Sequence, residues 1–96
     1  MITVKVRTIA RLKEIVGQEE IDLPVPQGST VSSLVELMVQ RWGEELSAHL
    51  SAPRHDQPLP RARILVNGQD IAFLKGIATI LREGDEVLML PLVGGG

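Results

Sequence analysis

Hydrophobic and polar residues alternate along three stretches of the chain, which is the pattern of half-buried β-strands. The stretches run from Ile2 to Ile9, from Glu19 to Val25 and from Ala62 to Val66. Pro24 and Pro26 each lack a backbone donor, so the second stretch is expected at an edge of the sheet. The sequence therefore predicts at least three strands with one apolar face each.

Two other stretches carry the spacing of helices. Ala10 to Gly17 predicts one or two helical turns that end at Gly17, and Val31 to Trp42 predicts the main amphipathic helix. Thr30 or Ser29 is expected to cap the start of this helix, and Gly43 follows its end. The apolar stripe of the main helix consists of Val31, Leu34, Val35, Leu37, Met38 and Trp42, with Trp42 expected to close the core.

Connections between these elements follow from turn residues. Glu44 to Leu50 predicts a short helical piece, and the proline-rich stretch from Ser51 to Pro60 predicts a long surface loop. Asn67-Gly68 is a strong hairpin signal and leads into a short strand at Gln69 to Ile71. Phe73 to Leu81 is compatible with a helical turn packed under the sheet through Leu74, Ile77, Ile80 and Leu81.

The last strand and the end of the chain differ from the rest. Val87 to Leu90 is apolar at every position, which predicts burial on both faces, and pairing is expected to stop near Pro91. Gly94 to Gly96 then form a pliable tether of at most about 10–11 Å. A frayed terminus is the simplest interpretation. The alternative is a terminus that enters a narrow channel in another protein.

The element order is strand, strand, helix, strand, short strand, strand. With one main helix covering one face of a small mixed sheet, it predicts an α+β fold of the β-grasp kind. We expect a single domain over residues 1–96 with a flexible tail at 94–96.

Composition excludes several classes of function. A net charge of −2 with only two aromatic residues is atypical of a nucleic-acid binder. The chain has no cysteine, and its two histidines lack metal-site spacing, so neither a thiol nucleophile nor a metal site is expected. No signal peptide or membrane span is recognisable, so a cytoplasmic protein is expected. An enzyme with catalytic residues of its own is therefore not predicted.

The outward face of the sheet is a candidate binding surface. If the first, last and third strands are neighbours, outward residues of the three strands form an apolar centre with a basic rim. Such a patch is typical of protein-binding surfaces, and the rim suits an acidic partner. The residues concerned are Lys5, Arg7, Ile9, Arg63, Leu65, Leu88 and Leu90, with Pro91 following.

Several pieces together resemble the MoaD/ThiS family of small sulfur carriers, in particular its molybdopterin synthase branch. The pieces are Ala10–Gly17, Val66–Asp70, Leu81–Val87 and Pro91–Gly96. Related chains often have a second proline where Leu92 stands and an aromatic residue in place of Ile9 and Leu90.

The resemblance implies a ubiquitin-like fold and a working group at the C-terminus. A partner enzyme of the ubiquitin-activating type (MoeB-like) would use ATP to adenylate the Gly96 carboxylate, and a sulfur donor would convert it to a thiocarboxylate. The large subunit of molybdopterin synthase (MoaE-like) would then use this sulfur for the molybdenum or tungsten cofactor. The chain itself would bind no cofactor and have no active site. Ile9 and Leu90 match positions that contact partners in the family.

The sequence leaves three alternatives open. The first is a ubiquitin-like modifier that is joined to proteins through Gly96, and the second is a sulfur carrier of the thiazole pathway. The third is a plain binding module whose tail has no role.

Overall fold

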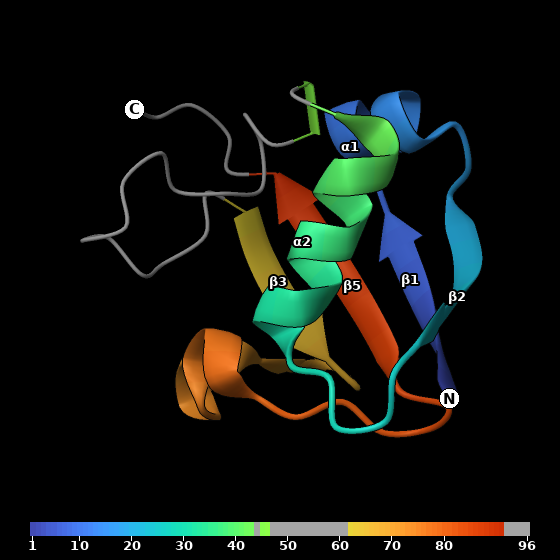
Figure 1. The fold of residues 1–96 in the computed structure, drawn as a ribbon. Coiled ribbons are helices and arrows are strands. Elements are labelled where there is room, and N and C mark those ends of the chain that lie inside the picture. The colour runs from blue at the N-terminus through green and yellow to red at the C-terminus, as the bar shows by residue number, and fades with distance from the viewer. Residues whose placement is uncertain (44, 47–61, 92–96) are drawn as a thin grey trace.

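The fold is a five-stranded mixed sheet that packs against one main helix. Figure 1 shows the computed structural model, which describes residues 1–43, 45–46 and 62–91. Within these ranges no helix has the length and apolar character needed to cross a membrane. The elements are β1 (Ile2–Thr8), α1 (Ala10–Val16), β2 (Glu20–Val25), α2 (Val31–Trp42), β3 (Ala62–Val66), β4 (Gln69–Asp70), the short 3₁₀ helices η1 (Ile71–Phe73) and η2 (Gly76–Ala78), and β5 (Glu86–Pro91).

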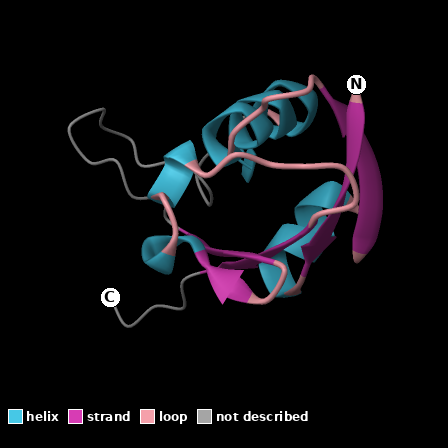
Figure 2. Cartoon of the chain, turned by 90° about the horizontal axis from the view of Figure 1, so that it is seen from below, coloured by secondary structure: helices cyan, strands magenta, loops and turns pink. Residues whose placement is uncertain are grey.

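The strands lie in the order β2-β1-β5-β3-β4. β1 and β5 are parallel, whereas β1–β2, β3–β5 and β3–β4 are antiparallel. The sheet curves around the helices, and α2 lies on its concave side (Figure 2). The α+β prediction and the edge position of β2 are therefore confirmed, and the first, last and third strands are neighbours as expected.

One hydrophobic cluster joins the concave face of the sheet to α1 and α2. The inward residues of β1, β3 and β5 are almost fully buried, and α2 adds its apolar stripe. Leu46 is also fully buried, whereas Leu50 and the predicted 51–60 loop lie outside the described residues. Trp42 packs against the cluster and remains half-buried, with the Arg41 guanidinium 5.0 Å from the centroid of its ring.

The helix boundaries follow the local signals. Thr30 caps α2, because its hydroxyl accepts a hydrogen bond from the Ser33 N–H at 3.2 Å. The alternative cap, Ser29, instead donates to the Pro26 carbonyl oxygen at 2.7 Å. Gly17 adopts a left-handed conformation (φ 89°) directly after α1, as its sequence position predicts.

The segment from Ile71 to Leu81 differs from its prediction. Its two 3₁₀ helices are three residues each, so no single helical turn brings all its apolar residues to one face. Leu81 is buried and Ile77 packs against the core, but Leu74 and Ile80 are exposed, which makes their predicted packing wrong. Phe73 is 79% exposed.

Candidate functional site

The convex face of the sheet brings the predicted binding residues of β1, β5 and β3 side by side. Leu88 lies between Arg7 of β1 and Leu65 of β3 in the sheet register. Leu90 pairs with Arg63 in the same way. No described helix covers this face (Figure 2). We call Leu65, Leu88 and Leu90, together with Ile9 directly after β1, the convex patch.

The exposure of the patch corrects the expectation for the last strand. Val87 and Met89 are fully buried, but Leu88 and Leu90 are only partly buried, so β5 is not buried on both faces. Ile9 is 43% exposed and caps α1 through its backbone, one position beyond the Thr8–Met89 pair. Leucines in partial contact with water on a face without a covering helix are available for a partner.

Ion pairs surround the patch, which changes the prediction of a basic rim. Glu20 lies 3.6 Å from both Lys5 and Arg7, and Arg7 also lies 3.6 Å from Glu86. All four side chains keep between 42% and 47% of their surface exposed. The rim is therefore a set of paired charges and not a band of uncompensated positive charge.

The third cation of the rim is held by a short contact. The Arg63 Nε donates to Asp70 Oδ2 at 3.0 Å, and the other oxygen of Asp70 accepts the Ala72 N–H at 2.9 Å. The Ala72 hydrogen bond, reinforced by Arg63, holds the pKa of Asp70 below its usual value. Asp70 therefore stays ionised and holds the Arg63 guanidinium toward β4, on the side of β3 opposite to Leu90.

A polar clamp fixes the position of β5, and this role is absent from the sequence prediction. Asn67 Nδ2 donates to Asp85 Oδ1, and Asn67 Oδ1 accepts the Glu86 N–H, both at 2.9 Å. The second Asp85 oxygen accepts the Arg82 N–H at 2.8 Å. Asn67 itself is left-handed (φ 52°), as the predicted two-residue turn requires. The sequence signal for it was that Asn67 and Asp85 each lie in a piece that resembles the MoaD/ThiS family, Val66–Asp70 and Leu81–Val87.

The predicted tail at 94–96 lies beyond Pro91, the last residue that the structure describes. Among the described residues, the last pair of the β3–β5 ladder is Ala62–Pro91. Gly94, Gly95 and Gly96 lie outside the described residues, and so do both histidines. Within the described part of the chain, no group of three or more acidic, histidine or cysteine side chains is placed to hold a metal ion.

Comparison with known proteins places this geometry in a family. The model of the ThiS family matches residues 6–96. A putative sulfur carrier protein of Archaeoglobus fulgidus is 36% identical over 97% of this chain and 98% of its own length. Small archaeal modifier protein 3 of Haloferax volcanii is 30% identical over 96% and 97%, respectively.

Solved structures share the fold over nearly the whole chain. The solution structure of a Haloferax volcanii protein has a TM-score of 0.83 at 29% identity and covers 99% of this chain and 87% of its own. A putative molybdopterin converting factor subunit 1 from Pyrococcus furiosus has a TM-score of 0.77 at 26% identity, covering 97% and 100%. The chain therefore belongs to the ThiS family of ubiquitin-like β-grasp proteins and is a protein of the sulfur-carrier type.

Proposed function

We propose that this chain carries sulfur as a thiocarboxylate on Gly96 and donates it to the synthesis of molybdopterin. The observation that carries the proposal is the family match, which extends from residue 6 through residue 96 and so includes the terminal glycines. The relative named as a putative sulfur carrier supports the same chemistry. The ordered end of β5 supports it from the structural side, because the ladder holds the chain up to Pro91.

The proposed chemistry takes place in two steps on the Gly96 carboxylate. An α-carboxyl group has a pKa of about 3.3–3.7 in the absence of perturbation and is ionised at neutral pH. One carboxylate oxygen attacks the α-phosphorus of ATP, and pyrophosphate leaves. A sulfur nucleophile then attacks the acyl carbon, and AMP leaves with that oxygen. The product is a thiocarboxylate, which needs no cysteine in the carrier.

The convex patch is the proposed docking surface for the partner proteins. These are an adenylating enzyme of the ubiquitin-activating type, which consumes the ATP, and the large subunit of molybdopterin synthase. Leu88 and Leu65 form the apolar centre, and Pro91 pairs with Ala62 at the described end of the β3–β5 ladder. The rim charges favour a partner that carries both charge signs. If such a partner breaks the ion pairs on binding, it must supply a counter-charge for the acidic and for the basic side chain of each pair.

The molybdenum or tungsten cofactor is the proposed destination of the sulfur. The likeness to the molybdopterin converting factor subunit from Pyrococcus furiosus supports this destination at 26% identity and a TM-score of 0.77. The large synthase subunit would supply the active site, and this chain would supply only the sulfur atom.

Protein modification is a second candidate function, favoured by the likeness to small archaeal modifier protein 3. It shares the first step. A lysine amine of a target protein would then attack the acyl-adenylate, AMP would leave, and an isopeptide bond would form. The two functions differ in the nucleophile that follows activation, so the partner proteins decide between them.

Mass spectrometry tests the proposal directly. The purified chain is incubated with its adenylating enzyme, ATP and a sulfide source. The expected product gains the mass of one sulfur in place of one oxygen, and the gain lies in the C-terminal peptide. A variant without Gly96, and one with a residue added after it, are expected to show no gain. An unchanged mass, while a known carrier reacts in parallel, would refute sulfur carriage.

A second experiment identifies the reaction that receives the sulfur. The thiocarboxylate form is mixed with the large synthase subunit and the pterin precursor, and loss of sulfur from the carrier together with dithiolene formation supports the proposal. Retention of sulfur there, combined with high-mass conjugates in cell extracts that vanish without Gly96, would favour protein modification. Full function of the extended variant would favour a plain binding module.

A further inference from the structure

The edge strand β2 offers backbone hydrogen-bonding groups that no described strand uses. Lys5 and Thr3 direct their backbone groups toward the β5 side, because the Lys5 N–H donates to Asp85 O and the Thr3 carbonyl accepts from Gly84, both at 2.9 Å. Their partners across the β1–β2 ladder, Asp22 and Pro24, therefore form non-hydrogen-bonded pairs. Their backbone groups point outward, away from the sheet.

The same alternation continues to the start of the strand. The Thr8 N–H donates to Glu19 O at 2.8 Å, so Glu19 faces β1 and Glu20 faces outward. The free edge thus presents the N–H groups of Glu20 and Asp22 and the carbonyl oxygens of both residues. Pro24 adds a carbonyl but no donor. An incoming strand would find its donors and acceptors toward the start of β2.

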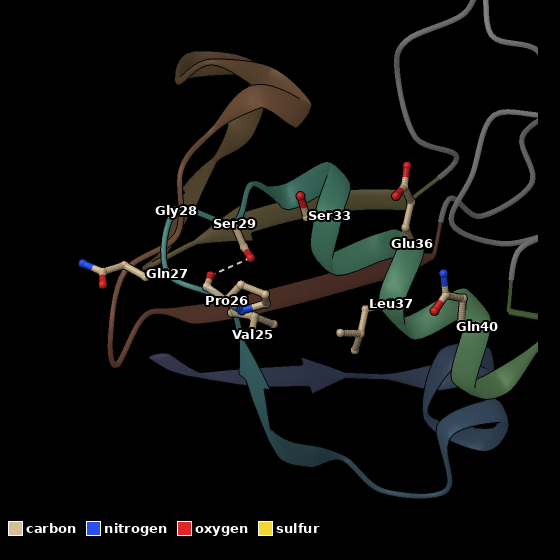
Figure 3. A pocket seen from close by; sticks show the side chains of 9 residues that line it. All are labelled: Val25, Pro26, Gln27, Gly28, Ser29, Ser33, Glu36, Leu37 and Gln40. Atoms are coloured by element: carbon tan, nitrogen blue, oxygen red, sulfur yellow. Dashed lines mark hydrogen bonds between the residues drawn. The ribbon is translucent and has the colours of Figure 1, made fainter. Parts of the chain in front are cut away.

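A groove runs beside the end of this strand, between β2 and α2 (Figure 3). Its volume is about 430 Å³, and Val25, Pro26 and Leu37 provide its apolar wall. Glu36 and Gln40, from the same helix as Leu37, add polar side chains to its lining. Side chains of a strand added to β2 would alternate between this groove and the convex face.

The edge carries both charge signs, with Lys5 opposite Asp22 in the β1–β2 register, but two acidic side chains beside it form no ion pair. Among the described residues, neither Asp22 nor Glu36 has a cation within 4.0 Å, whereas Glu20 is already paired with Lys5 and Arg7. This charge disfavours a second copy of the chain as the occupant, because antiparallel pairing of two β2 strands would bring like charges together. It favours a segment with basic side chains.

We propose that the β2 edge binds an extended basic segment of a partner protein as a sixth strand, with an apolar side chain of that segment in the groove. Backbone hydrogen bonds to Glu20 and Asp22 supply the general affinity, and the groove and the acidic side chains select the sequence. In the sheet, β1 separates this edge from β5. The inference is independent of the proposed sulfur chemistry.

Amide hydrogen exchange tests the proposal with a defined probe. A short peptide of alternating lysine and valine is added to the full-length, isotope-labelled protein, and exchange is followed by NMR. At about ten times the dissociation constant, the Glu20 and Asp22 amides are expected to exchange roughly tenfold more slowly, because only the unbound fraction exchanges. Ile21 and Leu23 serve as internal references, since their amides already face β1.

Matched probes and variants separate the contributions. A peptide with glutamate in place of lysine tests the charge, and one with serine in place of valine tests the groove; both are expected to bind more weakly. Asp22→Lys is expected to weaken binding of the lysine–valine peptide about tenfold. Gln69→Lys, which places the same new charge on the opposite edge strand β4, is the control and is expected to leave binding unchanged.

Three results would overturn the proposal. The first is unchanged exchange at Glu20 and Asp22 under saturating peptide. The second is equal binding of the lysine and glutamate peptides. The third is a concentration-dependent dimer in sedimentation experiments whose formation protects the same two amides, which would assign the edge to a second copy.

Discussion

Val87 and Met89 on the concave side of β5 are fully buried, whereas Leu88 and Leu90 on its convex side keep part of their surface in contact with water. All four residues are apolar and belong to one strand, so composition alone does not separate them. The position of α2 does, because it covers one face of the sheet only (Figure 1). The difference teaches that the inner residues of β5 hold the fold and the outer ones are available for binding.

The largest expected effect comes from the inner face. Met89→Ala removes a fully buried side chain from the centre of the core and is expected to destabilise the protein by about 2–5 kcal/mol. Urea unfolding followed by circular dichroism measures this free energy. Leu88→Ala on the neighbouring position is the matched control, and a smaller loss is expected there because the side chain is already partly exposed. Equal losses would show that the two faces do not differ.

The clamp that sets the position of β5 is expected to contribute less than the core. Asn67→Ala removes two side-chain hydrogen bonds and a residue suited to the left-handed conformation, so a loss of about 1–3 kcal/mol is expected. Urea unfolding provides the measurement.

Gln69→Ala is the control for the clamp, because Gln69 is exposed and lies in the same hairpin. A change within about 0.5 kcal/mol is expected for it. If Asn67→Ala were as mild as this control, the clamp would have no part in positioning β5.

These contacts mark the limit of prediction from sequence. The bounds of α2, its Thr30 cap and the Asn67-Gly68 turn depend on residues close together in the chain, so local patterns predict them. The Asn67–Asp85 contact joins residues 18 positions apart, and only the three-dimensional structure brings the two partners together. Pattern alone does not locate such contacts.

In the candidate site, too, some features could be predicted from local sequence patterns and others could not. That Leu65, Leu88 and Arg7 lie side by side on one face follows from strand order and alternation, and the structure confirms it. The pairing of Lys5 and Arg7 with Glu20 depends on side-chain conformations across β1 and β2, so the sequence predicted only a basic rim. The prediction of a helical turn in Phe73 to Leu81 was wrong because 3₁₀ segments of three residues are too short to show a periodic pattern of apolar residues.

Substitutions on the convex face are expected to change the affinity for a partner more than the stability of the fold. Leu88→Ser is expected to cost about 1 kcal/mol or less in stability, because the residue is partly exposed, and to weaken binding of the adenylating enzyme by at least about tenfold. Isothermal titration calorimetry gives the affinity, and urea unfolding gives the stability. Binding that stays unchanged would remove Leu88 from the proposed interface.

The smallest expected effect concerns Asp70, at the rim of the convex patch. Its folded-state pKa is lowered, chiefly by the Ala72 N–H and further by Arg63, so the native state favours the ionised carboxylate. The resulting stabilisation is present above the pKa of the unfolded chain, about 3.9, and is lost as the pH falls through the lower folded-state value. Asp70→Asn is therefore expected to reduce stability at neutral pH and to match the original protein in strong acid.

A second substitution separates the two causes of the Asp70 shift. Arg63→Gln removes the cation but leaves the Ala72 hydrogen bond in place, so NMR titration of the Asp70 carboxyl carbon is expected to show a pKa that is still lowered, though by less. Added salt is expected to act in the same direction as this substitution, since the Arg63 side chain is 61% exposed to solvent. If Arg63→Gln restored the ordinary pKa completely, the ion pair would be the main cause. The ionisation of Asp70 would then depend on its ion pair with Arg63 and not on the hydrogen bond from the Ala72 backbone.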